Sequence, residues 1–95
     1  MLRYIDDGLS RYINEEHYPW HMPGHKRSVP EIKYDTDNML KEIMHYDVTE
    51  VPGVDDLHHP EGMIKKSQDE MTKVYGTFAS YYLVNGSTCG IMTAI

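Results

Sequence analysis

Cysteine is nearly absent from this sequence. Cys89 is the only one among 95 residues, so the chain cannot form an internal disulfide and fits a reducing compartment. Basic residues are also few, nine against fifteen acidic ones, and the net charge of −6 argues against non-specific binding to nucleic acid or to an anionic membrane. No basic segment followed by an apolar run opens the sequence, so we expect no secretory signal and a cytoplasmic protein.

Charged residues are missing from the last part of the sequence, because none follows Lys73. A membrane span would also be uncharged, but it needs about 18 consecutive apolar residues. Glycine, serine, asparagine and threonine interrupt residues 74–95 too often for that. The alternative is an element covered on both faces, so we expect this segment to need neighbours that the chain does not contain.

Hydrophobic periodicity and breaker residues predict four short helices separated by loops. Pro60 is expected at the first position of the third helix, and Gly76 just after its last residue. The helices are predicted over residues 2–13, 35–47, 60–75 and from 87 onward. The second would be capped by Asp35, Thr36 or Asp37, and the third would bury a stripe of Ile64, Met71, Val74 and Tyr75.

One strand is predicted between the last two helices, over residues 77–84, "TFASYYLV". Its apolar residues are consecutive rather than alternating, which is typical of a strand covered on both faces, with Tyr81 and Tyr82 in the core. The order helix, strand, glycine turn, helix is the first unit of an α/β layer domain. The sequence therefore predicts an α/β fold class with one buried strand.

The turn after this strand, Gly86-Ser87-Thr88-Cys89, has the parts of a phosphate site. A helix start presents free N–H groups and a partial positive charge, glycine permits close approach of an anion, and hydroxyls add donors. No lysine follows the glycines and a third glycine is missing, so neither the P-loop nor the dinucleotide pattern is present. On spacing alone, Ser87 or Thr88 capping a helix explains the turn equally well.

Four stretches of the sequence together resemble the Orn/Lys/Arg decarboxylase family, which are pyridoxal-phosphate enzymes of the aspartate-aminotransferase fold. They are "HMPGHKRS" at 21–28, "DVTEVPGVDDLHHPEG" at 47–62, "YG" at 75–76 and "SYYLVNGSTCGIMTAI" at 80–95. The resemblance implies that pyridoxal 5'-phosphate is the cofactor and that Gly86, Ser87, Thr88 and Cys89 hold its phosphate. It also implies that His25 and Lys26 lie at the active-site entrance near subunit contacts.

The same resemblance implies a division of the chain into three segments. Residues 1–18 would be a helical arm, 19–60 entrance and interface loops with a short helix, and 61–95 the truncated start of the cofactor-binding major domain. In the family, the Schiff-base lysine and the acid on the pyridine nitrogen come after the phosphate loop, whereas the last lysine here is Lys73. We therefore expect an N-terminal fragment with no catalytic residue of its own.

By resemblance, the complete enzyme would be a lyase that decarboxylates lysine, arginine or ornithine, as in polyamine biosynthesis, and would form a homodimer or larger assembly. Two alternatives remain open at this point. The chain could be a catalytically inactive fragment or assembly module, or it could belong to a related aminotransferase-fold enzyme of other specificity. No nucleic acid or membrane partner is expected.

Two further patterns have simpler explanations than catalysis. His17, His21 and His25 are spaced by four, as in a helical zinc site, but Pro19, Pro23 and Gly24 exclude that helix and no metal site is expected. The pair Asp55-Asp56 suggests acid–base chemistry. We favour instead that these carboxylates cap the helix that opens near Pro60, or contact a neighbouring subunit.

Overall fold

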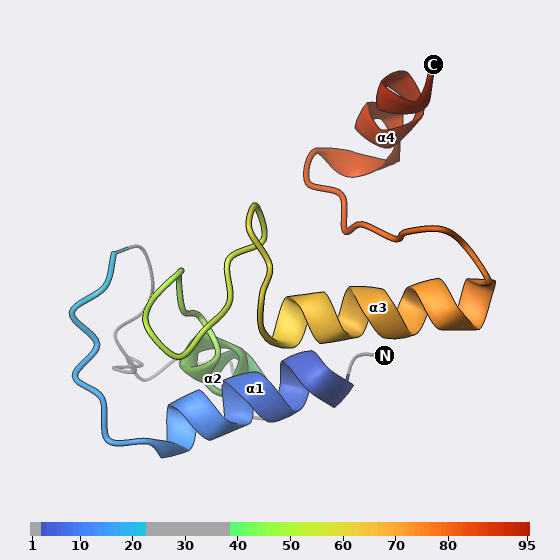
Figure 1. The fold of residues 1–95 in the computed structure, drawn as a ribbon. Coiled ribbons are helices and arrows are strands. Elements are labelled where there is room, and N and C mark those ends of the chain that lie inside the picture. The colour runs from blue at the N-terminus through green and yellow to red at the C-terminus, as the bar shows by residue number, and fades with distance from the viewer. Residues whose placement is uncertain (1–2, 23–38) are drawn as a thin grey trace.

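The computed structural model describes residues 3–22 and 39–95, and it contains four helices joined by irregular segments. They are α1 (Arg3–Asn14), α2 (Met39–His45), α3 (Met63–Tyr75) and α4 (Gly86–Ala94). Helices α1 and α3 lie side by side, while α4 stands apart at the end of an extended stretch (Figure 1). The four predicted helices are confirmed within the described ranges. The proposed caps of the second helix, residues 35–37, lie outside them.

The contact between α1 and α3 is centred on Gly8 and Met63. Gly8 is buried, and a Cβ added to it would lie 3.0 Å from Cβ of Met63 and would overlap the Met63 sulfur. One helical turn later, Tyr12 is only 5% exposed and approaches Gly53 of the loop between α2 and α3. Gly8 lies on the side of α1 that faces α3. Because glycine has no side chain, the two helices can approach each other closely there.

Gly8→Ala is expected to destabilise the contact between α1 and α3. Alanine gains about 1 kcal/mol in helix propensity, whereas overpacking costs about 1–3 kcal/mol, and here the nearest Met63 atoms include the poorly movable Cβ. Thermal unfolding followed by circular dichroism measures the balance. Asp7→Ala, at an exposed position of the same helix, is the control and should not lower the melting temperature.

The first turn of α3 corrects one prediction. Pro60 does not begin the helix, because α3 starts at Met63 and Gly62 precedes it in a non-helical conformation, with φ −112° and ψ −122°. The N–H groups of Glu61 and Gly62 are bound by the side chain of Asp55, which holds this turn outside the helix. At the other end the prediction is confirmed: Gly76 is left-handed (φ 63°) and its N–H donates to the Thr72 carbonyl.

The predicted buried stripe of α3 is wrong in its second half. Val74 and Tyr75 are each 69% exposed, and the buried residues of the helix are Ser67 and Gln68. Ile64 and Met71 are half-buried. The covered part of the helix is its polar middle, where Ser67 bonds Tyr82, while the apolar side chains of the last turn stay exposed.

The prediction of a strand over residues 77–84 is also wrong. Residues 77–84 form no strand in the described ranges, and Tyr81 is 74% exposed rather than in a core. The cause is the absence of a partner, because a strand exists only where another strand accepts and donates its backbone hydrogen bonds. The described residues offer none. One side-chain bond holds the segment to α3, between the hydroxyls of Tyr82 and Ser67 at 2.5 Å.

The chain is far more open than a compact domain of its size. Its accessible surface is 7714 Å², against about 5,700 Å² for a folded monomer of the same mass. Its radius of gyration is 15.9 Å, against about 12 Å for a compact chain of this length. Tyr12 is the one buried hydrophobic side chain among the described residues. Residues 3–22 and 39–95 therefore form no closed core.

Candidate functional site

The turn before α4 contains two neighbouring residues in the left-handed region of the backbone. Asn85 precedes the helix in the left-handed region, with φ 63° and ψ 22°, and Gly86 also has a positive φ of 76°. Asparagine and glycine tolerate this region better than other residues. The two residues lead the chain from the extended segment into α4, whose first N–H groups have no acceptor within the helix.

The hydroxyls of Ser87 and Thr88 do not cap α4. No side-chain hydrogen bond caps this helix start, and neither hydroxyl bonds another part of the described chain. By contrast, Thr93 on the same helix donates its hydroxyl to the Cys89 carbonyl at 2.8 Å. The capping explanation left open by the sequence is therefore wrong for this conformation, and two donors at the helix start remain available.

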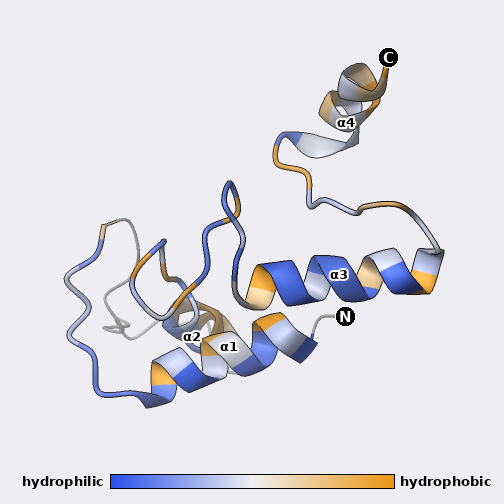
Figure 2. Cartoon of the chain, viewed as in Figure 1, coloured by the Kyte–Doolittle hydropathy of each residue, from blue (hydrophilic) through white to orange (hydrophobic). Residues whose placement is uncertain are grey.

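The surroundings of this turn are uncharged and accessible. Gly86, Ser87, Thr88 and Cys89 are all exposed, and Cys89 is a free thiol. No charged residue occurs after Lys73 in the sequence. In Figure 2, orange hydrophobic stretches alternate with paler ones along the extended segment, and α4 is mostly pale to orange, whereas α3 carries more blue. The donors that this turn itself offers to an anion are N–H groups and hydroxyls.

The other predicted site residues are not brought to this turn. His25 and Lys26 lie outside the described residues. His17 and His21 belong to the segment after α1, where His17 stacks on Tyr12 with ring centroids 5.0 Å apart and bonds the Glu15 carboxylate at 2.6 Å. Among the residues that the structure describes, no three His, Cys, Asp or Glu side chains are grouped as metal ligands.

Asp55 forms the densest polar cluster in the described chain. Its carboxylate accepts backbone hydrogen bonds at 2.8–3.3 Å from the N–H groups of five residues, namely Asp56, Glu61, Gly62, Ile64 and Lys65. Asp56 accepts one, from the N–H of His58 at 2.7 Å. The expectation that an aspartate of this pair caps α3 is confirmed, and Asp55 is the one that does so.

The same contacts shift the acidity of Asp55. Burial of the carboxyl group favours its neutral form and raises the pKa, but the backbone N–H groups of Glu61, Gly62, Ile64 and Lys65 together outweigh this effect. The pKa of Asp55 is therefore lower than its ordinary value. The carboxylate is charged at neutral pH, and it acts as an anchor for a helix rather than as an acid or base.

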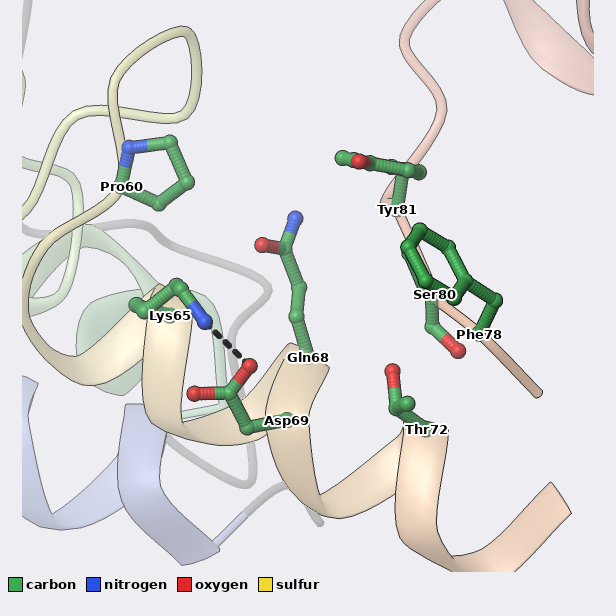
Figure 3. A pocket seen from close by; sticks show the side chains of 9 residues that line it. Pro60, Lys65, Gln68, Asp69, Thr72, Phe78, Ser80 and Tyr81 are labelled. Atoms are coloured by element: carbon green, nitrogen blue, oxygen red, sulfur yellow. Dashed lines mark hydrogen bonds and ion pairs between the residues drawn. The ribbon is translucent and has the colours of Figure 1, made fainter. Parts of the chain in front are cut away.

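A separate hollow of about 340 Å³ lies between α3 and the start of the extended segment. Gln68, only 5% exposed, points into it between Pro60 and Tyr81, beside the ion pair of Lys65 and Asp69 (Figure 3). The residues lining the hollow end at Tyr81, so it does not reach the turn at Gly86. Sequence reasoning missed the buried Gln68, because a glutamine in a helix gives no signal of burial.

Comparison with known proteins identifies the family. Residues 5–95 match the family model described as Orn/Lys/Arg decarboxylase, major domain. The chain belongs to this family. The match includes α4 and all of the turn at Gly86, and it supports the predicted fold class of pyridoxal-phosphate transferases, although the buried strand of that prediction is not formed in the described residues.

Individual relatives agree with the family. The chain is 35% identical over 88 residues to the uncharacterized protein YaaO of Bacillus subtilis. It is 30% identical over 92 residues to the arginine decarboxylase of Bacillus subtilis, and 34% identical over 92 residues to the arginine decarboxylase of Halalkalibacterium halodurans. These alignments cover 92–93% of this chain but 18% of each relative. The chain thus resembles a short stretch of the relatives that are named decarboxylases.

No solved structure matches the chain. Among the described helices, none has the length and apolar character that crossing a membrane requires. The family assignment therefore rests on sequence similarity.

Proposed function

We propose that this chain is the N-terminal part of a pyridoxal-phosphate-dependent decarboxylase of a basic amino acid, to which it contributes the phosphate anchor. The single observation behind the proposal is the turn at 85–88, where a left-handed Asn85-Gly86 pair opens a helix and leaves two hydroxyls unbonded. The family match and the relatives named arginine decarboxylase supply the reaction class. Arginine is accordingly the substrate we would test first.

The residues of the turn fit a phosphate group chemically. A dianion gains from the N–H groups and the partial positive charge of a helix start, and each hydrogen bond to a charged group contributes about 1.5–3 kcal/mol. Ser87 and Thr88 would donate through their hydroxyls, and Thr88 and Cys89 also through their N–H groups. Gly86 leaves the approach open, because it has no side chain and nothing lies within 4 Å of its added Cβ.

When bound, pyridoxal phosphate supplies an aldehyde for the substrate amine and a ring that accepts electrons as carbon dioxide leaves. The part of this chain is to fix the position of the phosphate, and with it the position of the ring. No lysine follows Lys73, so the proposal assigns no Schiff-base lysine to this chain.

The proposal also includes the division of the chain into three segments and the oligomeric state that the sequence predicts. Residues 1–18 would serve as a helical arm, 19–60 as entrance and interface loops that carry His25 and Lys26, and 61–95 as the start of the cofactor-binding domain. The complete enzyme would be at least a dimer. This division follows from the family resemblance and awaits an experiment.

A chimeric enzyme tests the proposed function directly. Residues 1–95 would replace the matching stretch of the Bacillus subtilis arginine decarboxylase, of which they cover 18%. We expect the purified chimera to retain pyridoxal phosphate, seen as visible absorbance that survives dialysis, and to release carbon dioxide from arginine. A chimera that folds, by circular dichroism and gel filtration, yet holds no cofactor would contradict the proposal.

A further inference from the structure

Asparagine is followed by glycine at one place in the sequence, Asn85-Gly86 in the turn before α4. The side-chain amide of an asparagine is lost without an enzyme when the backbone nitrogen of the next residue attacks it. The attack requires a free N–H on that residue, an amide that nothing holds, and room to close a five-membered ring. Glycine hinders the attack least, because it has no side chain.

The attacking nitrogen is free at this turn. Gly86 is the first residue of α4, so its N–H has no acceptor within the helix, and it donates to no other described residue. Nothing lies within 4 Å of a Cβ added to Gly86, so the space around this residue is open. The nitrogen can therefore approach the side chain of Asn85 without breaking a hydrogen bond.

The amide that would be attacked is free as well. Asn85 is exposed, its side chain does not cap α4, and no hydrogen bond joins it to the described chain. The helix that follows stands apart from α1 and α3, so packing between helices does not hold the turn in place (Figure 1). The fold therefore offers Asn85 no protection from the reaction.

Asn14 provides a contrast within the same chain. It is also exposed, but it is the last residue of α1, and the nitrogen that would attack it belongs to Glu15. The Glu15 N–H donates to the Arg11 carbonyl at 3.1 Å. Reaction at Asn14 has to break this hydrogen bond and open the end of the helix, and it meets a side chain that glycine lacks.

We propose that Asn85 is a site of spontaneous deamidation, whose product places a negative charge beside the turn that binds the cofactor phosphate. The Gly86 nitrogen bonds to the side-chain carbonyl carbon of Asn85, and its proton leaves with the amide as ammonia, which closes a succinimide ring. Water then opens the ring and is the one co-reactant. Addition of water at the side-chain carbonyl gives aspartate. Addition at the main-chain carbonyl gives isoaspartate, whose backbone runs through the former side chain.

The product changes the charge of an uncharged segment. Residues 74–95 contain no charged side chain, and deamidation adds a carboxylate directly before Gly86-Ser87-Thr88-Cys89. Neighbouring Cα atoms are about 3.8 Å apart, so this carboxylate lies close to any anion that the turn holds, and the two repel each other. The effect on the cofactor rests on the proposed function, whereas the modification itself does not.

Ageing of the purified chain of 95 residues tests the modification. After incubation in mildly alkaline buffer at physiological temperature, proteolysis and mass spectrometry measure the replacement of an amide by a carboxylate at each asparagine. In the folded chain we expect Asn85 to react at least about tenfold faster than Asn14. In denaturant the reaction at Asn14 should become faster, whereas the rate at Asn85 should stay within about twofold, because the folded chain does not protect it.

Two variants identify the reacting residue. Asn85→Gln should abolish the acidic form that ion exchange separates, because glutamine would have to close a larger ring. Asn14→Gln is the matched control and should leave formation of the acidic form unchanged. Equal rates at Asn85 and Asn14 would overturn the inference. A reaction at Asn85 that is slow in the folded chain and fast in denaturant would also overturn it, since the turn would then protect this residue.

The chimeric decarboxylase tests the effect of the charge. Asn85→Asp carries the charge of the product and should weaken pyridoxal phosphate binding at least about tenfold, whereas Asn14→Asp adds the same charge on α1 and should leave binding unchanged. If Asn85→Asp binds normally while loss of the Ser87 and Thr88 hydroxyls weakens binding, the phosphate anchor stands and the charge effect is overturned. If neither change weakens binding, the proposed function is overturned together with the charge effect, and the mass-spectrometric result alone decides the modification.

Discussion

Asp55→Ala is expected to lower the free energy of unfolding by about 2 kcal/mol, and the melting temperature by roughly 10 °C. The substitution leaves five backbone N–H groups without their acceptor and removes a negative charge from the start of α3. Tyr12 is the one buried hydrophobic side chain in the described chain, so little else holds this turn. Thermal unfolding followed by circular dichroism at 222 nm measures the effect.

Asp56→Ala is the matched control, because Asp56 accepts one backbone hydrogen bond where Asp55 accepts five. It should lower the free energy of unfolding by about 0.5–1 kcal/mol.

The charge of Asp55 adds a second measurement, the dependence of stability on pH. Its folded pKa is lowered, so its contribution is fully present above the unfolded pKa of about 3.9 and disappears as the pH falls through the folded value. The difference in the free energy of unfolding between wild type and Asp55→Ala should therefore be largest at neutral pH and become smaller in strong acid. Equal stability of the two Ala variants at pH 7 would show that Asp55 is not the anchor.

Ser87→Ala combined with Thr88→Val is expected to weaken pyridoxal phosphate binding by the chimeric decarboxylase about 100-fold. The pair removes two hydroxyl donors to a charged group, worth about 3 kcal/mol together, and each 1.4 kcal/mol corresponds to a tenfold change. Neither hydroxyl bonds the described chain, so the loss should fall on the cofactor rather than on the fold. Titration of the apo-chimera with pyridoxal phosphate, followed by visible absorbance, gives the dissociation constant.

Thr93→Val is the control on the same helix, because the Thr93 hydroxyl already donates to the Cys89 carbonyl. It should leave the dissociation constant for pyridoxal phosphate within about twofold of wild type, since the change amounts to a fraction of the 1.4 kcal/mol that a tenfold shift requires. If the double variant binds the cofactor as tightly as the Thr93 control, the phosphate is held elsewhere and the proposed role of the turn is wrong.

The parts of the chain that sequence reasoning predicted well are governed by local interactions. The helix over residues 2–13, the stop at Gly76 and the turn at Asn85-Gly86 follow from hydrophobic spacing and from residues that tolerate a left-handed conformation. The cap of α3 was foreseen as a role for the Asp55-Asp56 pair. The sequence does not predict that the Asp55 carboxylate also accepts a hydrogen bond from the N–H of Lys65, ten residues away, because the loop between them has to fold back for this bond to form.

The wrong predictions share one physical cause. The strand over residues 77–84 and the buried stripe at Val74 and Tyr75 both depend on neighbours that the described chain does not supply. Sequence pattern identifies a segment suited to burial, but burial and strand pairing need a second surface. The uncharged composition of residues 74–95 indicates such a need for neighbours, but it does not say where they come from.

The sequence by itself determined the family, the helices and the chemical nature of the turn at Gly86 to Cys89, because these depend on residue type, order and short spacing. Tertiary structure decided which aspartate anchors α3, that Gly8 is the contact with Met63, and that the hydroxyls of Ser87 and Thr88 stay unbonded. It also decided that the strand-like segment is left open. These outcomes depend on groups distant in the chain meeting or failing to meet, and no local pattern encodes such an encounter.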